Sequence, residues 1–314
     1  MESQSAEKGG FIVAKNAYQT ILYDKDKEVP QIAYITLNRP EKNNAISIGP
    51  NEVTGEIQEA VRRAQDDDEV KVVIFRGAGR SFSAGFDLSM VYRVYGGAPG
   101  VRPPQATRLR IDDEQLMGMP RSVLTCQKVT IAQVHGWCIE AGMYIVESCD
   151  IAIAAKNALF AHMGQRLAFG GMPYMPLELL MGHTKKITEL LITGRTIGAE
   201  EAEQAGIITK AVPTEDLESE VYSLAKAICL LPSDAIAVGK MCRRHAYEAI
   251  GLTSMMSGIT YHTLGTNLSY KPEERGVVFI RDREETGAKS AFHKLHTAFE
   301  AALGRTKYFK SKQP

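Results

Sequence analysis

The stretch from Val70 to Leu88, VKVVIFRGAGRSFSAGFDL, contains the pattern that decides the fold. Its first six residues are almost continuously apolar, which is typical of a strand that is covered on both faces. The small-residue turn Ser83-Ala84-Gly85 follows, and glycine there lets the backbone come close to a ligand. Phe86 then enters a helical pattern, and the amides at a helix start point outward without partners. We therefore expect a ligand to approach the backbone at this turn.

A second stretch, VHGWCIEAGMYIVESCD from Val134 to Asp150, has the same order of elements. A strand ends, a glycine-containing turn follows, and a helical pattern over 139–148 has its start near Ala141. Two such helix starts that converge on one thioester carbonyl would form an oxyanion hole from backbone N–H groups. From spacing alone this convergence is a hypothesis, because every layered α/β protein has several strand-to-helix turns.

Strand and helix patterns alternate on both sides of these two stretches. We expect further strands at 19–23, 31–38, 129–134 and 150–154, and helices at 50–64 and 104–126. From about residue 177 the patterns are helical, at 187–193, 199–205, 214–230 (with Thr214 as N-cap), 233–250 and 288–302. The alternation predicts an α/β layered fold. The expected organisation is a polar tail (1–15), an α/β core (16–200) and a helical C-terminal region (201–314), with a Gly/Pro-rich active-site flap at 96–105.

The composition excludes several classes of protein. Of 314 residues, 37 are Lys or Arg and 37 are Asp or Glu, which argues against nucleic acid or an anionic membrane as the main partner. The five cysteines are scattered without metal-site spacing, so we expect reduced thiols and no metal centre. The polar N-terminus has no apolar signal region, and no stretch approaches the ~18 apolar residues of a membrane helix. We therefore expect a soluble, cytoplasmic protein.

Four motifs in this order resemble the crotonase (enoyl-CoA hydratase/isomerase) superfamily. They are AYITLNRPEKNNAIS, VVIFRGAGRSFSAGFDL, QVHGWCIEAGMYIVESCDIAIAA and ELLITGRTIGAEEAEQAGIITKAVP, and the resemblance covers roughly residues 20–250. It implies a spiral of ββα turns, a helical C-terminal trimerisation region and a coenzyme A (CoA) thioester as substrate. It also implies that the amides of Phe86 and Ala141 bind the thioester oxygen. The residues implied to lie along CoA are Asn44, Ala45, Ile46, Ser83, Ala84 and Gly85.

The sequence departs from the superfamily at the two glutamates that activate water in its hydratases. The first position is Tyr144 and the second falls near Gly164, so neither is a carboxylate. A tyrosine with an ordinary pKa near 10 is a poor general base at pH 7. We therefore assign proton transfer to other groups, with Tyr144 and His162 preferred and Glu140, beside Ala141, as a further candidate.

Three further charged residues are expected to be structural. Asp87 is expected to order its turn, Arg166 to form a salt bridge, and Glu147 to be a charge on a helix face.

The resemblance implies an acyl-CoA enzyme of the enoyl-CoA hydratase/isomerase type that acts through an enolate. The alternatives are a C–C bond or thioester hydrolase or decarboxylase that uses non-glutamate groups, and a non-catalytic CoA-binding homologue. We expect no cofactor other than the CoA of the substrate, no nucleic-acid or membrane partner, and a homotrimer or dimer of trimers.

Overall fold

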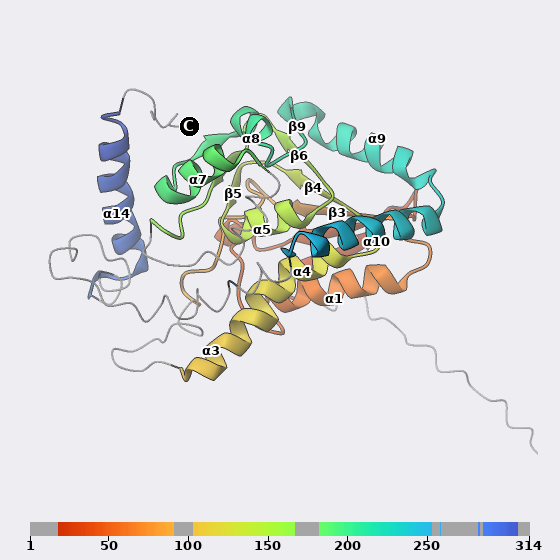
Figure 1. The fold of residues 1–314 in the computed structure, drawn as a ribbon, viewed down its shortest axis with the longest axis horizontal. Coiled ribbons are helices and arrows are strands. Elements are labelled where there is room, and N and C mark those ends of the chain that lie inside the picture. The colour runs from red at the N-terminus through yellow and green to blue at the C-terminus, as the bar shows by residue number, and fades with distance from the viewer. Residues whose placement is uncertain are drawn as a thin grey trace, which may run out of the picture.

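A six-stranded sheet with the order β1-β2-β3-β4-β6-β9 lies at the centre of the protein (Figure 1). The computed structural model describes residues 18–90, 103–166, 182–252 and 285–306, together with residues 258 and 282. β1 and β2 are antiparallel, and the other neighbouring strands are parallel. The strands are β1 (Ile21–Lys25), β2 (Ile32–Leu37), β3 (Val72–Gly77), β4 (Val129–Val134), β6 (Ile151–Ala155) and β9 (Lys210–Val212).

Both faces of this sheet are buried, as the apolar run at β3 predicts. Val73 and Phe75 point into the larger core, which also contains side chains of α1 (Val53–Asp66), α4 (Gly118–Thr125) and α5 (Ala141–Ser148). Val72 and Ile74 alternate with them and pack in a second core against α9 (Leu217–Cys229) and the first turns of α10 (Ser233–Ala249). Because successive side chains of a strand point to opposite faces, a strand covered on both faces is apolar at every position.

A smaller sheet of three short strands stands beside the first. It contains β5 (Trp137–Ile139), β7 (Leu159–Ala161) and β8 (Ile197–Gly198), and α7 (Thr184–Thr193) and α8 (Ala199–Ala205) flank β8 in the chain. The expected helix at 139–148 is therefore wrong at its first residues. Ile139 pairs with Ala161 in β5 and β7, so the helix α5 begins only at Ala141.

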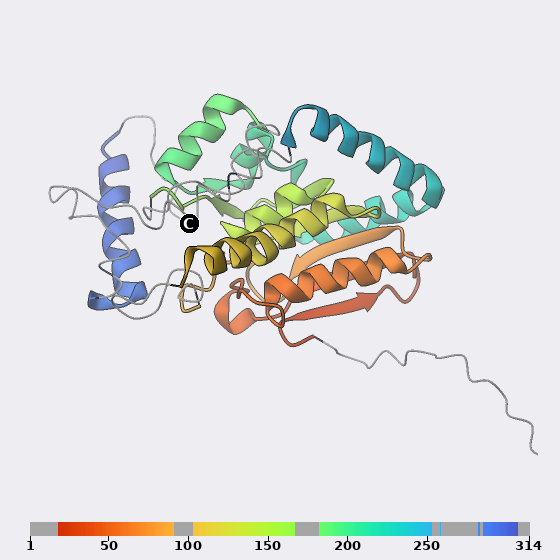
Figure 2. The same cartoon turned by 60° about the horizontal axis from the view of Figure 1, so that its bottom comes forward.

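The predicted helix at 104–126 is present but is not uniform. It consists of α3 (Gln105–Ile111), a π-helical turn η2 (Asp112–Met117) and α4. Figure 2 shows this helix running alongside α1. Thr54 and Gln58 of α1 hold η2 by hydrogen bonds to the Gln115 side chain and the Glu114 carbonyl. A π-helical turn is rare, often occurs at functional sites, and has no signal in the pattern of apolar residues.

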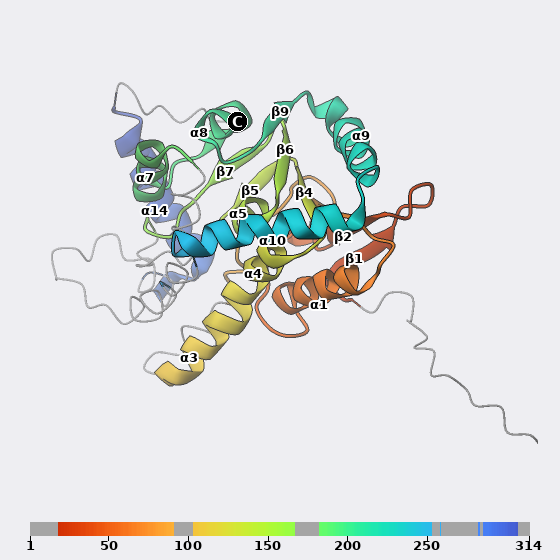
Figure 3. The same cartoon turned by 45° about the vertical axis from the view of Figure 1, so that its right-hand side comes forward.

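A short 3-10 turn, η1 (Pro40–Lys42), lies between β2 and α1. The C-terminal region, by contrast, is mainly helical. Thr214 is not the N-cap of α9, because it lies in a separate 3-10 turn, η3 (Thr214–Asp216), and α9 starts at Leu217. The expected boundary at residue 200 is not the end of the sheet, since β9 follows it and pairs with β6. Figure 3 shows α10 crossing the molecule in front of α4 and α5.

The last described helix, α14 (Ala288–Leu303), is the blue helix in Figure 1. Its Ala291 and Leu295 pack against Ile139, Ala161 and Met163. Within the described ranges no single helix has the length and apolarity to cross a membrane, although α9 with its preceding turn and α10 pass that test as a pair bent by 104°.

Candidate active site

The turn that contains Gly85 is held by a parallel bridge to Ile46. The amide of Ile46 donates to the Gly85 carbonyl at 2.7 Å, and the amide of Asp87 donates to the Ile46 carbonyl at 2.8 Å. Such a bridge uses the groups on either side of Phe86, so the N–H of Phe86 itself points away from Ile46. The expected helix start at Phe86 is therefore wrong, and the amide is exposed by a β-bridge instead.

The second turn lies directly beside the first. Ser83 donates to the Trp137 carbonyl at 2.8 Å and accepts from the Ile139 amide at 3.0 Å. Gly85 has a φ of 85°, and a Cβ there would lie 3.0 Å from the Ile139 carbonyl oxygen. Glycine is required at this position by both the backbone conformation and the space. The turn of Phe86 and the start of α5 are thus packed together, as the convergence hypothesis expected.

Ala141 is the first residue of α5, and its amide has no acceptor within the helix. Among the described residues no hydrogen bond from the Phe86 or Ala141 amide is formed. The positive end of the α5 dipole adds to the attraction for negative charge at this point. Both backbone amides are therefore available to donate to a ligand beside the turn.

The residues expected along CoA divide into two groups. Asn44 and Ser83 are buried and build the loop: the Asn44 side chain donates to the Ala78 and Ser81 carbonyls at 2.8 Å, and Ser83 donates to the Asn44 carbonyl at 2.8 Å. Gly85 and Ile46 are also buried, whereas Ala84 is exposed and Ala45 is partly exposed. Only the last two have side chains that a bound molecule can reach from solvent.

Asp87 anchors the same turn. Its carboxylate accepts from Arg39 at 2.8 Å, from Lys42 at 3.2 Å and from the Ser89 hydroxyl at 2.5 Å. Burial alone would raise the pKa of Asp87, but these hydrogen bonds outweigh it and lower the pKa to about 2. This is the ordering role that the sequence predicts for Asp87.

Glu140 occupies an unusual backbone position directly before Ala141. Its φ is 45° and its ψ is −113°, a conformation that costs a non-glycine residue of order 1–3 kcal/mol. The Glu140 amide donates to the Ala161 carbonyl at 3.0 Å, and one carboxylate oxygen accepts from the Met163 amide. These bonds tie the residue to β7 and its following loop, so they hold the carboxylate at the start of α5.

The second carboxylate oxygen of Glu140 connects the other two candidates for proton transfer. It lies 3.2 Å from Nδ1 of His162 and 3.5 Å from the hydroxyl of Tyr144. The rings of Tyr144 and His162 have centroids 5.3 Å apart, and the ring of Phe86 lies 6.0 Å from that of Tyr144. The structure thus brings the partly exposed Glu140 together with the buried Tyr144 and His162 in one cluster next to the Ala141 amide.

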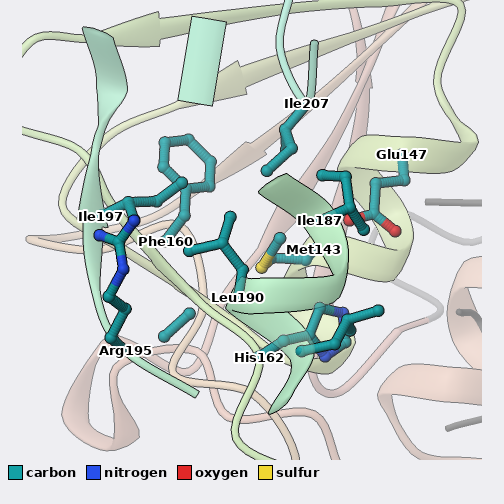
Figure 4. Close-up of a pocket in the computed structure, with 11 residues that line it drawn as sticks. Met143, Glu147, Phe160, His162, Ile187, Leu190, Arg195, Ile197 and Ile207 are labelled. Atoms are coloured by element: carbon teal, nitrogen blue, oxygen red, sulfur yellow. The ribbon is translucent and has the colours of Figure 1, made fainter. Parts of the chain in front are cut away.

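Arg166 and Glu147 are both buried. Arg166 bonds the Gly194 carbonyl at 2.9 Å and Glu300 of α14 at 2.8 Å, which is the structural salt bridge expected for it. Glu147 lies on α5 as expected, but the helix face that carries it is buried, and its exposed fraction is 2%. It lines a cavity of about 20 Å³ with Met143, His162, Leu190 and Arg195 (Figure 4). This volume is sufficient for about one water molecule.

One further buried acid, Asp112 of η2, was not found by the sequence reasoning. The available signal was a charged residue four positions after Arg108 and four positions before the apolar Leu116. Among the residues that the structure describes, no group of three or more His, Cys, Asp or Glu side chains could hold a metal ion.

Comparisons with known proteins agree with this architecture. Residues 27–262 match the family model for enoyl-CoA hydratase/isomerase. A putative enoyl-CoA hydratase, EchA13 of Mycobacterium tuberculosis, is 32% identical over 272 residues, covering 79% of this chain and 84% of that protein.

Solved structures give the same result. A probable enoyl-CoA hydratase from Mycobacterium smegmatis is 30% identical with a TM-score of 0.69, covering 78% of this chain and 93% of its own. An enoyl-CoA hydratase/isomerase from Xanthobacter autotrophicus Py2 is 26% identical with a TM-score of 0.74, covering 90% and 99%. The chain has the crotonase fold, is an acyl-CoA enzyme and belongs to the enoyl-CoA hydratase/isomerase family.

Proposed function

We propose that this enzyme isomerises the double bond of an enoyl-CoA through an enolate whose oxygen is bound by the amides of Phe86 and Ala141. The observation that carries the proposal is the carboxylate of Glu140, which is 13% exposed, directly precedes Ala141 and contacts His162. A hydratase uses two acid–base groups to place a water, whereas an isomerase moves one proton between two carbons. A single carboxylate is sufficient for the second task.

The oxyanion site is proposed to supply most of the stabilisation of the enolate. Removing one backbone-type donor from an oxyanion hole costs about 3 kcal/mol in the transition state. Two such donors, next to the positive end of α5, would lower the barrier to removal of the α-proton by several kcal/mol. The buried surroundings of the start of α5 strengthen these bonds, because little water competes for the amides.

The proton transfer is proposed to proceed on the Glu140 carboxylate. It takes a proton from C2 of a 3-enoyl-CoA, and the electron pair passes to the thioester oxygen to give a dienolate. The same carboxyl group returns the proton to C4, which leaves the double bond between C2 and C3. His162 and Tyr144 position the carboxylate through the 3.2 Å and 3.5 Å contacts.

Further proposals concern CoA binding, cofactors and assembly. We propose that CoA lies along the loop at Ala45 and Ala84 and that no further cofactor takes part. A cytoplasmic homotrimer or dimer of trimers, completed by the C-terminal helices, is supported by exposed apolar side chains there. These include Leu230, Val238 and Ile250, which are 86%, 62% and 51% exposed.

The test is incubation of the full chain with a panel of acyl-CoAs in D₂O, followed by mass spectrometry and absorbance of the conjugated thioester. We expect 3-hexenoyl-CoA to give 2-hexenoyl-CoA and hexanoyl-CoA to exchange its α-protons for deuterium. Gain of one water would indicate hydration or hydrolysis instead, and loss of carbon dioxide a decarboxylase. Binding without exchange or turnover over the panel would refute the proposal.

Variants of the cluster make this test specific. Glu140→Gln should lower isomerisation and exchange by about 10²–10⁴-fold, because a general base contributes that much. Tyr144→Phe and His162→Ala should each cause a smaller loss. The matched control is Glu200→Gln, an exposed glutamate that pairs with Lys156 and should leave both rates unchanged.

A further inference from the structure

Asp112 is a carboxyl group that the helix from α3 to α4 buries completely. It begins the π-helical turn η2, and its exposed fraction is 0%. Within the described ranges neither of its carboxyl oxygens has a hydrogen-bond partner. Buried polar groups are nearly always hydrogen-bonded, and burying one without a partner is costly. A buried carboxyl group of this kind can bind a molecule other than the protein.

The helix face that carries Asp112 is turned toward the candidate oxyanion residue. Ile111 and Leu116 of the same helix pack in one buried cluster with Phe86. Leu116 follows Asp112 by about one turn, so both lie on the same face. The ring of Phe86 also contacts the ring of Tyr144, which belongs to α5. Asp112 therefore lies on the helix that packs against Phe86, beside the proposed oxyanion site.

A buried basic residue on this helix, Arg108, does not account for Asp112. Arg108 is also buried and lies one turn earlier, but no hydrogen bond or ion pair joins the two side chains among the described residues. Burial raises the pKa of Asp112 to about 7, with the Arg108 charge acting in the opposite direction. At neutral pH a large part of the population has the carboxylic acid, which can both donate and accept a hydrogen bond.

We propose that Asp112 determines specificity by binding a hydroxyl or keto oxygen on the acyl chain beyond its β-carbon. This rests on the proposed function, since it requires the thioester at Phe86 and Ala141. A carboxylic acid donates to a keto oxygen and exchanges hydrogen bonds with a hydroxyl. A plain hydrocarbon would leave the buried acid without a partner, and sites built to bond a polar substrate group reject analogues that lack it.

The experiment compares binding of hexanoyl-CoA with that of its 4-, 5- and 6-hydroxy and 4- and 5-oxo derivatives by titration calorimetry. We expect the enzyme to bind at least one oxygenated chain about tenfold more tightly than hexanoyl-CoA, as a hydrogen bond to a buried acid allows. Asp112→Leu should bring this ratio to about one by weakening only the oxygenated ligand. Asp113→Asn, on the exposed side of the same helix, should keep the ratio of the parent enzyme.

Equal binding of oxygenated and plain chains by the parent enzyme, or an unchanged ratio in Asp112→Leu, would overturn the proposal. Asp112→Ala serves the same purpose if the leucine variant does not fold. α-Proton exchange in hexanoyl-CoA distinguishes a failure of the Asp112 proposal from a failure of the proposed function. If exchange is present without a preference for oxygenated chains, only the role of Asp112 fails; if binding and exchange are both absent, the proposed function fails as well.

Discussion

Replacement of Asp112 by asparagine should stabilise the protein in a manner that depends on pH. The folded pKa is about 7 against an ordinary value of 3.8, so the unfolded chain releases this proton first as the pH rises. Stability from this group is therefore complete below pH 4 and is lost as the pH rises to about 7. With 1.36 kcal/mol for each pH unit, the loss is about 1.5 kcal/mol at pH 5 and about 4 kcal/mol at pH 8.

The assay is urea unfolding of both proteins at pH 5 and pH 8, at one protein concentration because assembly affects apparent stability. Asparagine cannot ionise, so the gain of Asp112→Asn over the parent should increase by about 2.5 kcal/mol between the two pH values. Any constant effect of the amide cancels in this difference. Asp113→Asn, half exposed and paired with Arg121, is the control and should change stability by no more than about 0.5 kcal/mol. A gain that is the same at both pH values would refute the assignment of Asp112 as a buried acid.

The other predictions concern the two turns of the site. Glu140→Gly should raise the free energy of unfolding by about 1 kcal/mol, and with it the melting temperature, because it relieves the positive φ, whereas α-proton exchange should be lost. A lower melting temperature would contradict the assigned strain. Gly85→Ala should lower stability by about 1–3 kcal/mol, because its Cβ would lie 3.0 Å from the Ile139 carbonyl, and unfolding at parental urea concentrations would disprove it. Asp87→Asn should cost about 2 kcal/mol at pH 7, a loss that disappears between pH 4 and pH 2 because the folded pKa is about 2, as acid unfolding curves can measure.

The sequence was sufficient for the central strands and for the turns beside them. The apolar run at Val70 predicts a strand buried on both faces, and the structure has Val72 and Val73 in opposite cores. It failed where a local pattern is ambiguous. Ile139 is apolar in either a helix or a strand, and only its pairing with Ala161 in β7 decides for the strand. The pattern at Phe86 is ambiguous in the same way. It predicts a helix start, but the bridge to Ile46 places Phe86 in a β-bridge, which exposes its amide.

The sequence by itself determined the family and the two turns, because ordered motifs and the spacing of apolar residues are local properties of the chain. The tertiary structure decided which side chains meet. His162 lies 22 positions after Glu140, and only the pairing of β5 with β7 brings the imidazole within 3.2 Å of the carboxylate. Likewise, Asp112 is one of three consecutive acidic residues in the sequence, and nothing there distinguishes it. Only the packing of η2 against Phe86 removes its side chain from water. Burial and long-range proximity depend on how distant segments pack, and side-chain periodicity along one segment carries no information about its partner.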